Sequence, residues 1–449
     1  MCENDLGGRM STPATHRPQL EDNRAEPSLS HGSDPAALHP GPGCRFCGLP
    51  LEHMVVDLGM SPLCESFIPA YGLDTMEPFY PLRVFTCSGC YLVQLPQYVS
   101  PQEIFAHYAY FSAYSESWLA HAKAYVEDIT KLLDLNANSQ VVEVASNDGY
   151  LLQYFLEKGI PALGIEPAAN VAHAAQARGV ETLVEFFNTQ VAEKLLRGGL
   201  QVDLIIGNNV LAQVPDLNSF VKSIKILLGP TGVATLEFPH LLRLMESTQF
   251  DTNYHEHFSY FSFSTAERIF AAHGLTLFDV EELPTHGGSI RIYARHQEDG
   301  SRPVSPRAVA LKEQEQEAGL NSLAVYTSFQ ERVERAKRDL LTFLIDARRS
   351  GKRIAAYGAP GKGNTLLNYC GIRTDLIEYT VDLNPFKQGM FLPGTHIPVY
   401  PPARLAETRP DYILILPWNI KGEIAGQLAY TRRWGAKLVV PIPEVEVLN

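Results

Sequence analysis

The sequence predicts an α/β protein in which two parallel sheets follow a small cysteine-bearing module. Three observations lead to this fold class. Strand-like apolar runs alternate with helical segments from residue 140 to residue 238, and a second series of the same kind covers residues 353–440. Such alternation is typical of doubly wound parallel sheets. Ahead of both series, four cysteines stand in two closely spaced pairs within residues 44–90.

The composition limits the class of the protein and its partners. The chain has 449 residues, of which 45% are hydrophobic, so it is long and apolar enough for about three globular domains. Its net charge of −13 argues against a nucleic-acid partner, because neutralising phosphates requires a basic face. The sequence has neither an apolar run of about 18 residues nor a signal pattern at its N-terminus. We therefore expect no membrane partner and a cytoplasmic location.

The N-terminal part divides into an extension and a metal-binding module. Residues 1–40 are rich in Pro, Ser, His, Asp and Gly without apolar periodicity, so we expect a disordered extension. Residues 41–100 suggest short strands and turns around two C-x-x-C pairs, which are Cys44 with Cys47 and Cys87 with Cys90. Four thiolates make a tetrahedral zinc set that leaves no position for a catalytic water, so the pattern predicts structural zinc. The alternative is four reduced thiols without a metal.

Residues 101–303 are expected to form the central domain. It opens with a helix over about residues 115–135, in which Trp118, His121 and Tyr125 stand at helical spacing. Strands are predicted at residues 140–145, 161–165, 202–206 and 233–238, with helical segments between them. Residues 304–449 are expected to form a Rossmann-like domain, in which a long helix over about residues 306–350 precedes strands at 353–357, 377–382, 412–416 and 437–440. Two sheets of this type suggest two nucleotide-bearing ligands.

Small and polar residues follow the strands of the central sheet, at the edge where α/β proteins bind ligands. The run Glu-Val-Ala-Ser-Asn-Asp-Gly at 143–149 ends the first strand, a glutamate ends the second about twenty residues on, and two asparagines follow a later strand. The dinucleotide fingerprint G-x-G-x-x-G is absent, so the site suits S-adenosylmethionine better. A set of plain capping loops is the alternative interpretation. The predicted cofactor residues are Glu143, Ala145, Asn147, Asp148, Gly149, Glu166, Asn208 and Asn209.

The segment Tyr254-His255-Glu256-His257 places two imidazoles, a carboxylate and a phenol in consecutive residues. In an extended strand the two histidines would share one side, whereas at the mouth of a cleft all four side chains could converge on a substrate. Such groups supply a base with a pKa near neutrality and donors for an oxyanion, as proton abstraction beside a carbonyl requires. The alternatives are a satisfied polar strand end and a chance metal site.

A glycine-rich turn follows the first strand of the C-terminal sheet, at Tyr357-Gly-Ala-Pro-Gly-Lys-Gly-Asn-Thr365. Its lysine spacing does not fit a Walker loop. A turn that feeds a helix N-terminus nevertheless suits an anion, with Lys362 as its counter-charge. Asp382, at the end of the next strand, could hold a sugar or ribose hydroxyl. The alternative is that these Gly and Pro residues serve packing alone.

In chain order these motifs are joined by Tyr108-Ala-Tyr-Phe-Ser112 and Thr285-His-Gly-Gly288. The whole set, which covers residues 44–443, resembles the C-methyltransferases of deoxysugar biosynthesis. Those enzymes transfer a methyl group from S-adenosylmethionine to C3 of dTDP-4-keto sugars, and the resemblance extends to the tetronitrose pathway, whose substrate carries a 3-amino group. It implies a zinc module that helps to close over the sugar, a central methyltransferase sheet, a C-terminal Rossmann-like domain and a monomer.

The resemblance also implies roles for individual residues. His257 would be the base, and Tyr108, Tyr254, His255 and Glu256 would line the keto-sugar. The substrate, a dTDP-linked keto-deoxysugar, would also be bound by Gln213, His286, Lys362 and Asn364. The family usually has a histidine where this chain has Gln213, and an amide can hydrogen-bond there but cannot titrate.

The residues agree with an enolate mechanism, in which a base removes the proton next to the ketone and the resulting carbanion takes the methyl group. The sequence also allows an NAD-dependent sugar dehydrogenase or epimerase that uses the C-terminal sheet, methyl transfer to an oxygen or nitrogen of another acceptor, and a zinc-bearing scaffold. The missing G-x-G-x-x-G disfavours the dehydrogenase, and the Tyr-His-Glu-His segment disfavours the scaffold.

Overall fold

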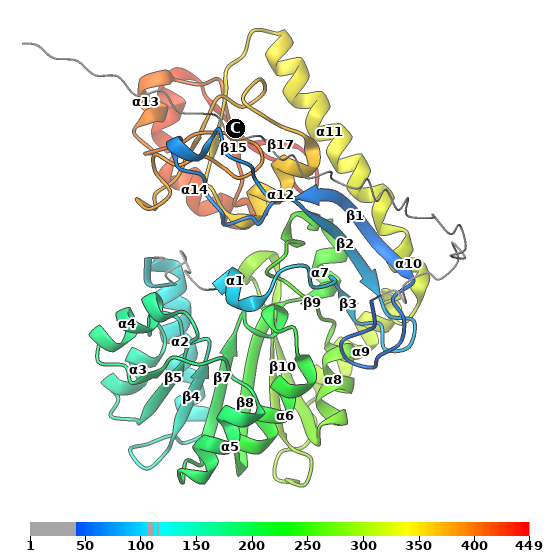
Figure 1. Ribbon diagram of the computed structural model, residues 1–449, viewed down its shortest axis with the longest axis vertical. Coiled ribbons are helices and arrows are strands. Elements are labelled where there is room, and N and C mark those ends of the chain that lie inside the picture. The colour runs from blue at the N-terminus through cyan, green and yellow to red at the C-terminus, as the bar shows by residue number, and fades with distance from the viewer. Residues whose placement is uncertain (1–41, 106–111, 115, 449) are drawn as a thin grey trace, which may run out of the picture. The chain divides into compact units, whose positions relative to one another are not determined.

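The computed structural model describes residues 42–105, 112–114 and 116–448, which fold around three β-sheets (Figure 1). The expected extension over residues 1–40 and the predicted site residue Tyr108 lie outside the described residues. Within the part of the chain that is described, no helix is long and apolar enough to cross a membrane.

The N-terminal sheet is antiparallel, in the order β1-β2-β3-β9. Its strands are β1 (His53–Ser61), β2 (Tyr80–Thr86), β3 (Val93–Gln94) and β9 (Ser259–Tyr260), with η1 (Ala70–Gly72) and α1 (Pro101–Phe105) beside them. β9 directly follows the Tyr-His-Glu-His segment in sequence. Because Val93 of β3 pairs with Tyr260 of β9, this segment is fixed against the cysteine-bearing module.

The central sheet has the order β10-β11-β8-β7-β4-β5-β6. Its strands are β4 (Val141–Val144), β5 (Ala162–Ile165), β6 (Thr182–Leu183), β7 (Val202–Asn208), β8 (Leu228–Pro239), β10 (Leu275–Leu283) and β11 (Ser289–His296). The pairs β4–β5, β5–β6, β4–β7 and β7–β8 are all parallel, which confirms the predicted doubly wound sheet. The antiparallel pair β10 and β11 at one edge is not predicted from the sequence, because charged residues interrupt its apolar pattern.

Helices flank the central sheet and connect its strands. They are α2 (Glu116–Leu132), α3 (Leu152–Glu157), α4 (Ala169–Ala177), α5 (Thr189–Arg197), α6 (Leu217–Leu227), α7 (Leu241–Glu246) and α8 (Phe263–Ala272), with the short turns η2 (Ser112–Tyr114), η3 (Leu211–Gln213), η4 (Phe250–Thr252) and η5 (Thr285–Gly287). The order of the strands along the chain reverses at β4, which lies between β5 and β7. In open α/β sheets the carboxyl ends of the strands at such a point form the ligand crevice.

The C-terminal sheet has the order β14-β13-β12-β15-β16-β17. Its strands are β12 (Ile354–Tyr357), β13 (Thr380–Val381), β14 (Val399–Tyr400), β15 (Tyr412–Ile415), β16 (Lys437–Val440) and β17 (Glu446–Leu448), and only β17 is antiparallel to its neighbour. Around it lie α12 (Gly361–Cys370), α13 (Arg404–Thr408), α14 (Lys421–Gln427), η6 (Trp418–Ile420) and η7 (Ala429–Trp434). The strand predicted at residues 377–382 is reduced to the two residues of β13.

The single long helix predicted over residues 306–350 is wrong. The chain forms α9 (Pro306–Glu317), α10 (Leu323–Thr327) and α11 (Phe329–Arg349) instead. Gly319 adopts φ +79°, which ends α9, and the Ser322 hydroxyl accepts from the N–H of Ala324 to start α10. The break lets α10 and α11 pack against β1, as Figure 1 shows for the yellow helices and the blue strand.

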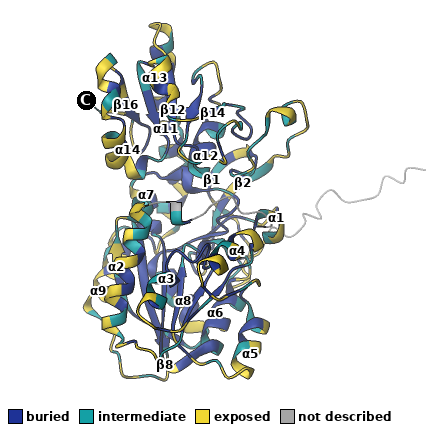
Figure 2. Ribbon diagram, turned by 90° about the vertical axis from the view of Figure 1, so that its left-hand side faces the viewer, coloured by how far each residue is buried: buried dark blue, intermediate teal, exposed yellow. Residues whose placement is uncertain are grey.

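The N-terminal sheet does not have a core of its own. Val56, Leu82 and Val84 belong to the same buried cluster as Leu340 of α11 and Ile413 of β15. Figure 2 shows the strands of the larger sheets as buried, with exposed residues on the outer helices. A change in the fold of the N-terminal module is therefore expected to affect the C-terminal domain through shared apolar contacts.

Candidate active site

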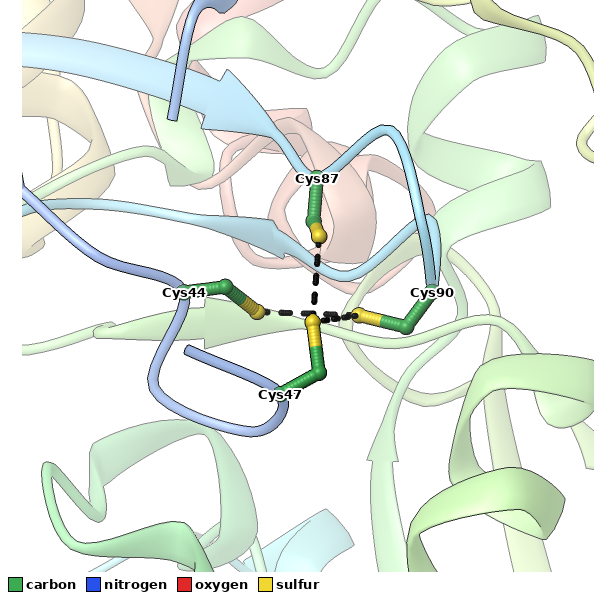
Figure 3. A group of neighbouring side chains, drawn as sticks. All are labelled: Cys44, Cys47, Cys87 and Cys90. Carbon is green, nitrogen blue, oxygen red and sulfur yellow. Dashed lines mark hydrogen bonds between the residues drawn. The ribbon is translucent and has the colours of Figure 1, made fainter. Parts of the chain in front are cut away.

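The four predicted zinc ligands converge on one point (Figure 3). Sγ of Cys44 lies 3.6 Å from Sγ of Cys90, and Sγ of Cys47 lies 3.4 Å from Cys87 and 3.8 Å from Cys90. Four sulfur atoms at about 2.3 Å from a tetrahedral zinc are separated by about 3.8 Å, so the cluster has the size that zinc requires. Gln94 donates from Nε2 to Sγ of Cys44 over 3.2 Å and orients that ligand. All four positions are sulfur, which confirms a closed structural set.

A cavity of about 800 Å³ opens at the carboxyl ends of β4, β5 and β7. The N-terminal module, the segment between η4 and β9, and the C-terminal domain also contribute to its wall. The predicted site residues that line it are Ala145, Asn147, Glu166, Asn208, Asn209, Gln213, Tyr254, Glu256, His257, His286 and Lys362. The predicted site residues that lie elsewhere among the described residues are Glu143, Asp148, Gly149, His255 and Asn364.

The turn after β4 is held in an unusual backbone conformation. Ala145, Asn147 and Gly149 have φ values of +57°, +50° and +77°. A Cβ atom on Gly149 would lie 2.8 Å from a methyl carbon of Val180, so only glycine fits between the turn and the end of α4. Gly149 therefore shapes the turn and is not among the residues that line the cavity.

Glu166 joins the turn after β4 to the start of α4. It lies at the predicted cofactor end of the cavity, which is the end lined by Ala145, Asn147, Glu166 and Asn208. Its Oε2 accepts from the N–H of Asn147 over 3.0 Å, and its Oε1 accepts from the N–H of Ala168 over 2.9 Å. Burial raises the pKa of this carboxyl, while the two N–H groups act in the opposite direction. Each oxygen keeps a lone pair that can accept from a hydroxyl in the cavity.

Asp148 and Glu143 lie behind the residues that line the cavity, and their expected role as ligands of the cofactor stays a prediction. Asp148 pairs with Arg178 over 3.0 Å and accepts from the N–H of Ala113 over 3.2 Å, so it ties the turn to α4 and to the chain before α2. Glu143 is fully buried within β4, and burial raises the pKa of its carboxyl well above the ordinary range. Neither residue is among those that line the cavity.

Aromatic and amide groups complete the cofactor end. Phe186 and Phe187, which follow β6, present apolar surface to the cavity. Asn208 donates from Nδ2 to the hydroxyl of Tyr150 over 3.3 Å, while its Oδ1 accepts nothing from the described residues. Trp118 stacks on Tyr150 with a centroid separation of 6.0 Å. These groups fit S-adenosylmethionine. The carboxylate of Glu166 suits its ribose hydroxyls, the amide oxygen of Asn208 suits its amino group, and the apolar walls suit its purine.

His257 has the geometry of a general base. Its Nδ1 lies 3.1 Å from the carbonyl oxygen of Thr252, which can only accept, so Nδ1 carries the proton and Nε2 keeps its lone pair. The ring of Tyr254 lies 4.2 Å from that of His257, centroid to centroid. Burial lowers the pKa of His257 to about 4, and the nearby charges of His286 and Lys362 act in the same direction. The imidazole is therefore neutral, and able to accept a proton, at neutral pH.

His255 has a different environment, away from the residues that line the cavity, and its expected place beside the sugar stays a prediction. Nε2 of His255 lies 3.2 Å from the carbonyl oxygen of Pro81, and its ring meets Tyr80 and Tyr98 edge-on at 5.8 and 6.5 Å. The physical reason is a turn, closed by the N–H of His257 donating to Tyr254 over 2.9 Å. The turn sends His255 onto β2 and leaves His257 at the cavity.

Glu256 belongs to a buried group of charges that the sequence does not predict. Sγ of Cys64 lies 3.6 Å from Oε1 of Glu256, and Nζ of Lys387 lies 3.1 Å from Oε2 of Glu65. Burial raises the pKa of Glu256 to about 8, with the charge of Glu65 adding to the shift. Glu256 therefore holds a proton at neutral pH and can donate it in a hydrogen bond. Cys64 and Glu65 are adjacent in sequence, but nothing local indicates their distant partners.

A second charge network stands behind the other wall. Oε2 of Glu237 lies 2.9 Å from Nε2 of His121 and 2.6 Å from Nη2 of Arg291, and its Oε1 accepts from the hydroxyl of Thr285 over 2.9 Å. Burial acts to raise the pKa of Glu237, but these partners outweigh it and lower the pKa to about 2. The network ties α2 and β11 to the loop of His286. A lone glutamate within the apolar run of β8 is the signal that could have indicated it.

The remaining predicted substrate residues divide between the cavity and the protein interior. His286 lies in a left-handed conformation with φ +54°, and Nδ2 of Asn209 lies 3.2 Å from its Nε2. Gln213 ends η3 and lines the cavity as an uncharged amide. Asn364 instead donates to the backbone carbonyl of Cys64 over 2.5 Å from within α12. Asn364 is not among the residues that line the cavity, and its expected contact with the substrate stays a prediction.

Comparisons with known proteins agree with this arrangement. Family models match consecutive parts of the chain: a zinc binding domain over residues 44–105, a methyltransferase domain over residues 117–280 and a C-methyltransferase C-terminal domain over residues 284–443. C-methyltransferase NovU of Streptomyces niveus is 34% identical over 407 residues, which are 90% of this chain and 96% of that protein.

Two solved structures of methyltransferases each cover less than half of this chain. A SAM-dependent methyltransferase from Thermotoga maritima has a TM-score of 0.34 and 18% identity over 44% of this chain and 100% of its own. The 1,6-didemethyltoxoflavin-N1-methyltransferase of Burkholderia thailandensis has a TM-score of 0.34 and 18% identity over 46% of this chain and 95% of its own. Because the relative in Streptomyces niveus matches almost the whole chain, the chain belongs to the C-methyltransferase family and is an S-adenosylmethionine-dependent enzyme with a structural zinc site.

Proposed function

We propose that this C-methyltransferase methylates C3 of a dTDP-linked 4-keto-deoxysugar through an enolate that His257 generates. The observation that carries the proposal is the free Nε2 of a neutral imidazole, in one cavity with the residues of the cofactor end. Carbon methylation needs such a base, because a carbon next to a ketone is nucleophilic only after it has lost its proton.

In the proposed step, Nε2 of His257 takes the proton from C3. The electron pair of the C–H bond forms the C3–C4 double bond, and the C4 oxygen becomes an enolate. One well-placed base contributes about 10²–10⁴-fold to the rate. S-adenosylmethionine, when bound, supplies the methyl group on a sulfonium, and the enolate carbon is its nucleophile.

Hydrogen-bond donors around the base support the choice of a polyoxygenated substrate. Glu256 holds a proton because burial raises its pKa to about 8, so it can donate to a sugar oxygen at neutral pH. Gln213 and Tyr254 also line the cavity, and each has a polar side chain. In this arrangement Glu256 would donate a hydrogen bond and His257 would accept the proton, so two different residues have these two roles.

The position of the cavity supports a long, two-part substrate. Ala145, Asn147 and Glu166 line its end at the methyltransferase sheet, whereas Gly361 and Ile420 line it from the C-terminal domain. We therefore propose that the nucleotide of the sugar extends toward the C-terminal domain while the ketone lies between His257 and the cofactor. Binding at both ends would hold the reacting carbon in line with the methyl group.

The test is NMR of the product formed from carbon-13-methyl S-adenosylmethionine and a dTDP-4-keto-2,6-dideoxy sugar, with and without a 3-amino group. The expected result is a labelled methyl on a quaternary C3, and the accepted sugar identifies the C3 substituent. A label on another ring carbon would correct the position, and a label on oxygen or nitrogen would contradict the enolate.

A further inference from the structure

Lys362 is an unusual cation for a buried cavity, because no carboxylate neutralises it directly. The lysines that line the cavity are Lys362 and Lys387. Nζ of Lys387 lies 3.1 Å from Oε2 of Glu65, so its charge is already paired. Within the described residues, Lys362 forms no ion pair with a carboxylate. The charge of Asp251 acts on Lys362 without an ion pair between them among the described residues, while burial lowers the pKa of Lys362. A buried ammonium whose carboxylate is this distant is costly, so an anion that arrives with the ligand would stabilise it.

The Lys362 side chain is nevertheless held in one place. Its Nζ donates to Oδ1 of Asn419 over 2.8 Å and lies 4.7 Å from the centre of the Trp418 ring. The indole N–H of Trp418 donates in turn to Oδ2 of Asp251 over 2.7 Å. An ammonium group has three donors, and the bond to Asn419 uses one of them. The group is therefore fixed in position with donors to spare.

Lys362 lines the same cavity as His257 and His286, and its charge acts on both imidazoles. Burial is the main reason why the pKa values of His257 and His286 are low, and the charge of Lys362 lowers both further. Burial raises the pKa of Asp251, in η4, and the positive charge of Lys362 acts to lower it. The ammonium and the imidazole of His257 therefore share one cavity, and the charge of the first acts on the second.

We propose that Lys362 is a catalytic residue whose ammonium group neutralises the enolate oxygen at C4, with Asp251 and Trp418 as its positioning residues. This inference rests on the proposed function. When His257 takes the proton of C3, the imidazole becomes a cation in the same cavity as Lys362. Two buried cations repel each other unless an anion lies near both, and the enolate oxygen formed in that step is such an anion.

The rival role for Lys362 is to bind the diphosphate of the nucleotide. The two roles make different demands on the same side chain. If Lys362 binds the diphosphate, it contributes to the affinity for dTDP without the sugar. If it binds the enolate, it contributes to the rate of proton removal and leaves the affinity for dTDP unchanged.

The experiment measures the exchange of the C3 hydrogen for deuterium in D₂O, with S-adenosylhomocysteine in place of the methyl donor, together with the affinity for dTDP alone. For Lys362→Met we expect exchange about 10²–10³-fold slower than in the wild-type enzyme, as for the loss of one oxyanion donor, with unchanged dTDP affinity. Lys362→Arg, which keeps the charge, should recover part of the rate. Lys362→Gln replaces the Met variant if circular dichroism shows that the Met variant is unfolded.

Two outcomes would overturn the inference and are distinguishable. In the first outcome, Lys362→Met exchanges the C3 hydrogen as fast as the wild-type enzyme but binds dTDP more weakly. That result would assign the lysine to the diphosphate and leave the proposed function intact. No exchange in the wild-type enzyme would overturn the proposed enolate itself, and the role of Lys362 with it.

Discussion

The zinc site and the catalytic cavity both gather reactive side chains, and they are built in opposite ways. The zinc site takes its four sulfur atoms from residues 44–90 and is closed, with neighbouring Sγ atoms 3.4–3.8 Å apart. The cavity of about 800 Å³ takes its side chains from the N-terminal module, the central sheet and the C-terminal domain, and it leaves atoms free for ligands. A closed metal site contributes folding energy, whereas an open site contributes chemistry. Damage to the first should lower stability, and damage to the second should lower turnover.

The largest effect is expected from the zinc site. Cys87→Ser should lose the metal and much of the stability of the N-terminal module, because structural zinc contributes about 10–16 kcal/mol to folding in small zinc domains. The loss should spread, since the N-terminal sheet shares its core with the C-terminal domain. Metal analysis and thermal melting measure both effects. Cys370→Ser, a buried cysteine outside the cluster, is the matched control and should keep its zinc. A metal-free Cys87→Ser protein with full activity would contradict the structural role.

The next effect separates the two histidines of the Tyr-His-Glu-His turn. His257→Ala should lower turnover by about 10²–10⁴-fold with little change in melting temperature, because it removes the proposed base. His255→Ala should have the reverse profile, since His255 is buried against Tyr80 and Pro81 outside the cavity. Methyl-transfer rates and melting temperatures of the two variants provide the test. Equal turnover in both variants would remove the distinction between them.

Glu237→Gln tests whether the charge network beside the cavity contributes to the stability of the protein, as zinc does in the N-terminal module. The variant leaves Arg291 buried beside a neutral amide, which should cost about 3 kcal/mol in the free energy of unfolding by urea. Glu298→Gln is the control, because Glu298 pairs with Lys225 on the surface with its side chain 74% exposed, and it should cost less than about 1 kcal/mol.

The lowered pKa of Glu237 leads us to expect a pH dependence of stability. Its pKa in the folded protein is about 2 against an ordinary 4.5, so the folded state binds fewer protons than the unfolded state between these values. The stabilisation from Glu237 is therefore present above pH 4.5 and is lost as the pH falls toward 2. Acid unfolding of Glu237→Gln should be less steep in this range than that of the wild-type protein. Equal slopes would contradict the depressed pKa.

The smallest effect concerns the base. With a pKa of about 4 instead of the usual 6.5, His257 should keep its lone pair well below neutral pH. The groups that face it are Tyr254, Tyr260, His286 and Lys362, and of these only His286 titrates in the same range, with a pKa that burial also lowers to about 4. The rate at low substrate concentration should therefore stay level through pH 6.5 and fall only near pH 4. A decline centred near pH 6.5 would show that the base is more exposed than the structure indicates.

The contrast between the two regions also explains what the sequence could predict. Cys44, Cys47, Cys87 and Cys90 define the zinc site because C-x-x-C spacing fixes each pair locally. The parallel strands β4, β5, β7 and β8 could be predicted from apolar runs, and the order of strands then placed Ala145, Glu166 and Asn208 at one edge.

Contacts between distant segments could not be predicted in this way. Glu237 meets His121 and Arg291 only after β8, α2 and β11 have packed, and Trp418 reaches Asp251 across 167 positions of the chain. The turn that separates His255 from His257 depends on the pairing of β9 with β3, which no local pattern indicates. The break at Gly319 was visible as a single glycine, but its position became decisive only through the packing of α10 and α11 on β1.

The most direct test of the account is whether the enzyme forms a carbanion at all. The measurement is hydrogen–deuterium exchange at C3 of the keto-sugar in D₂O with S-adenosylhomocysteine bound, in the wild-type enzyme and in His257→Ala. We expect exchange at that carbon in the wild-type enzyme and a rate at least about 10²-fold lower in the variant. Exchange at equal rates in both proteins, or none in the wild-type enzyme, would contradict it.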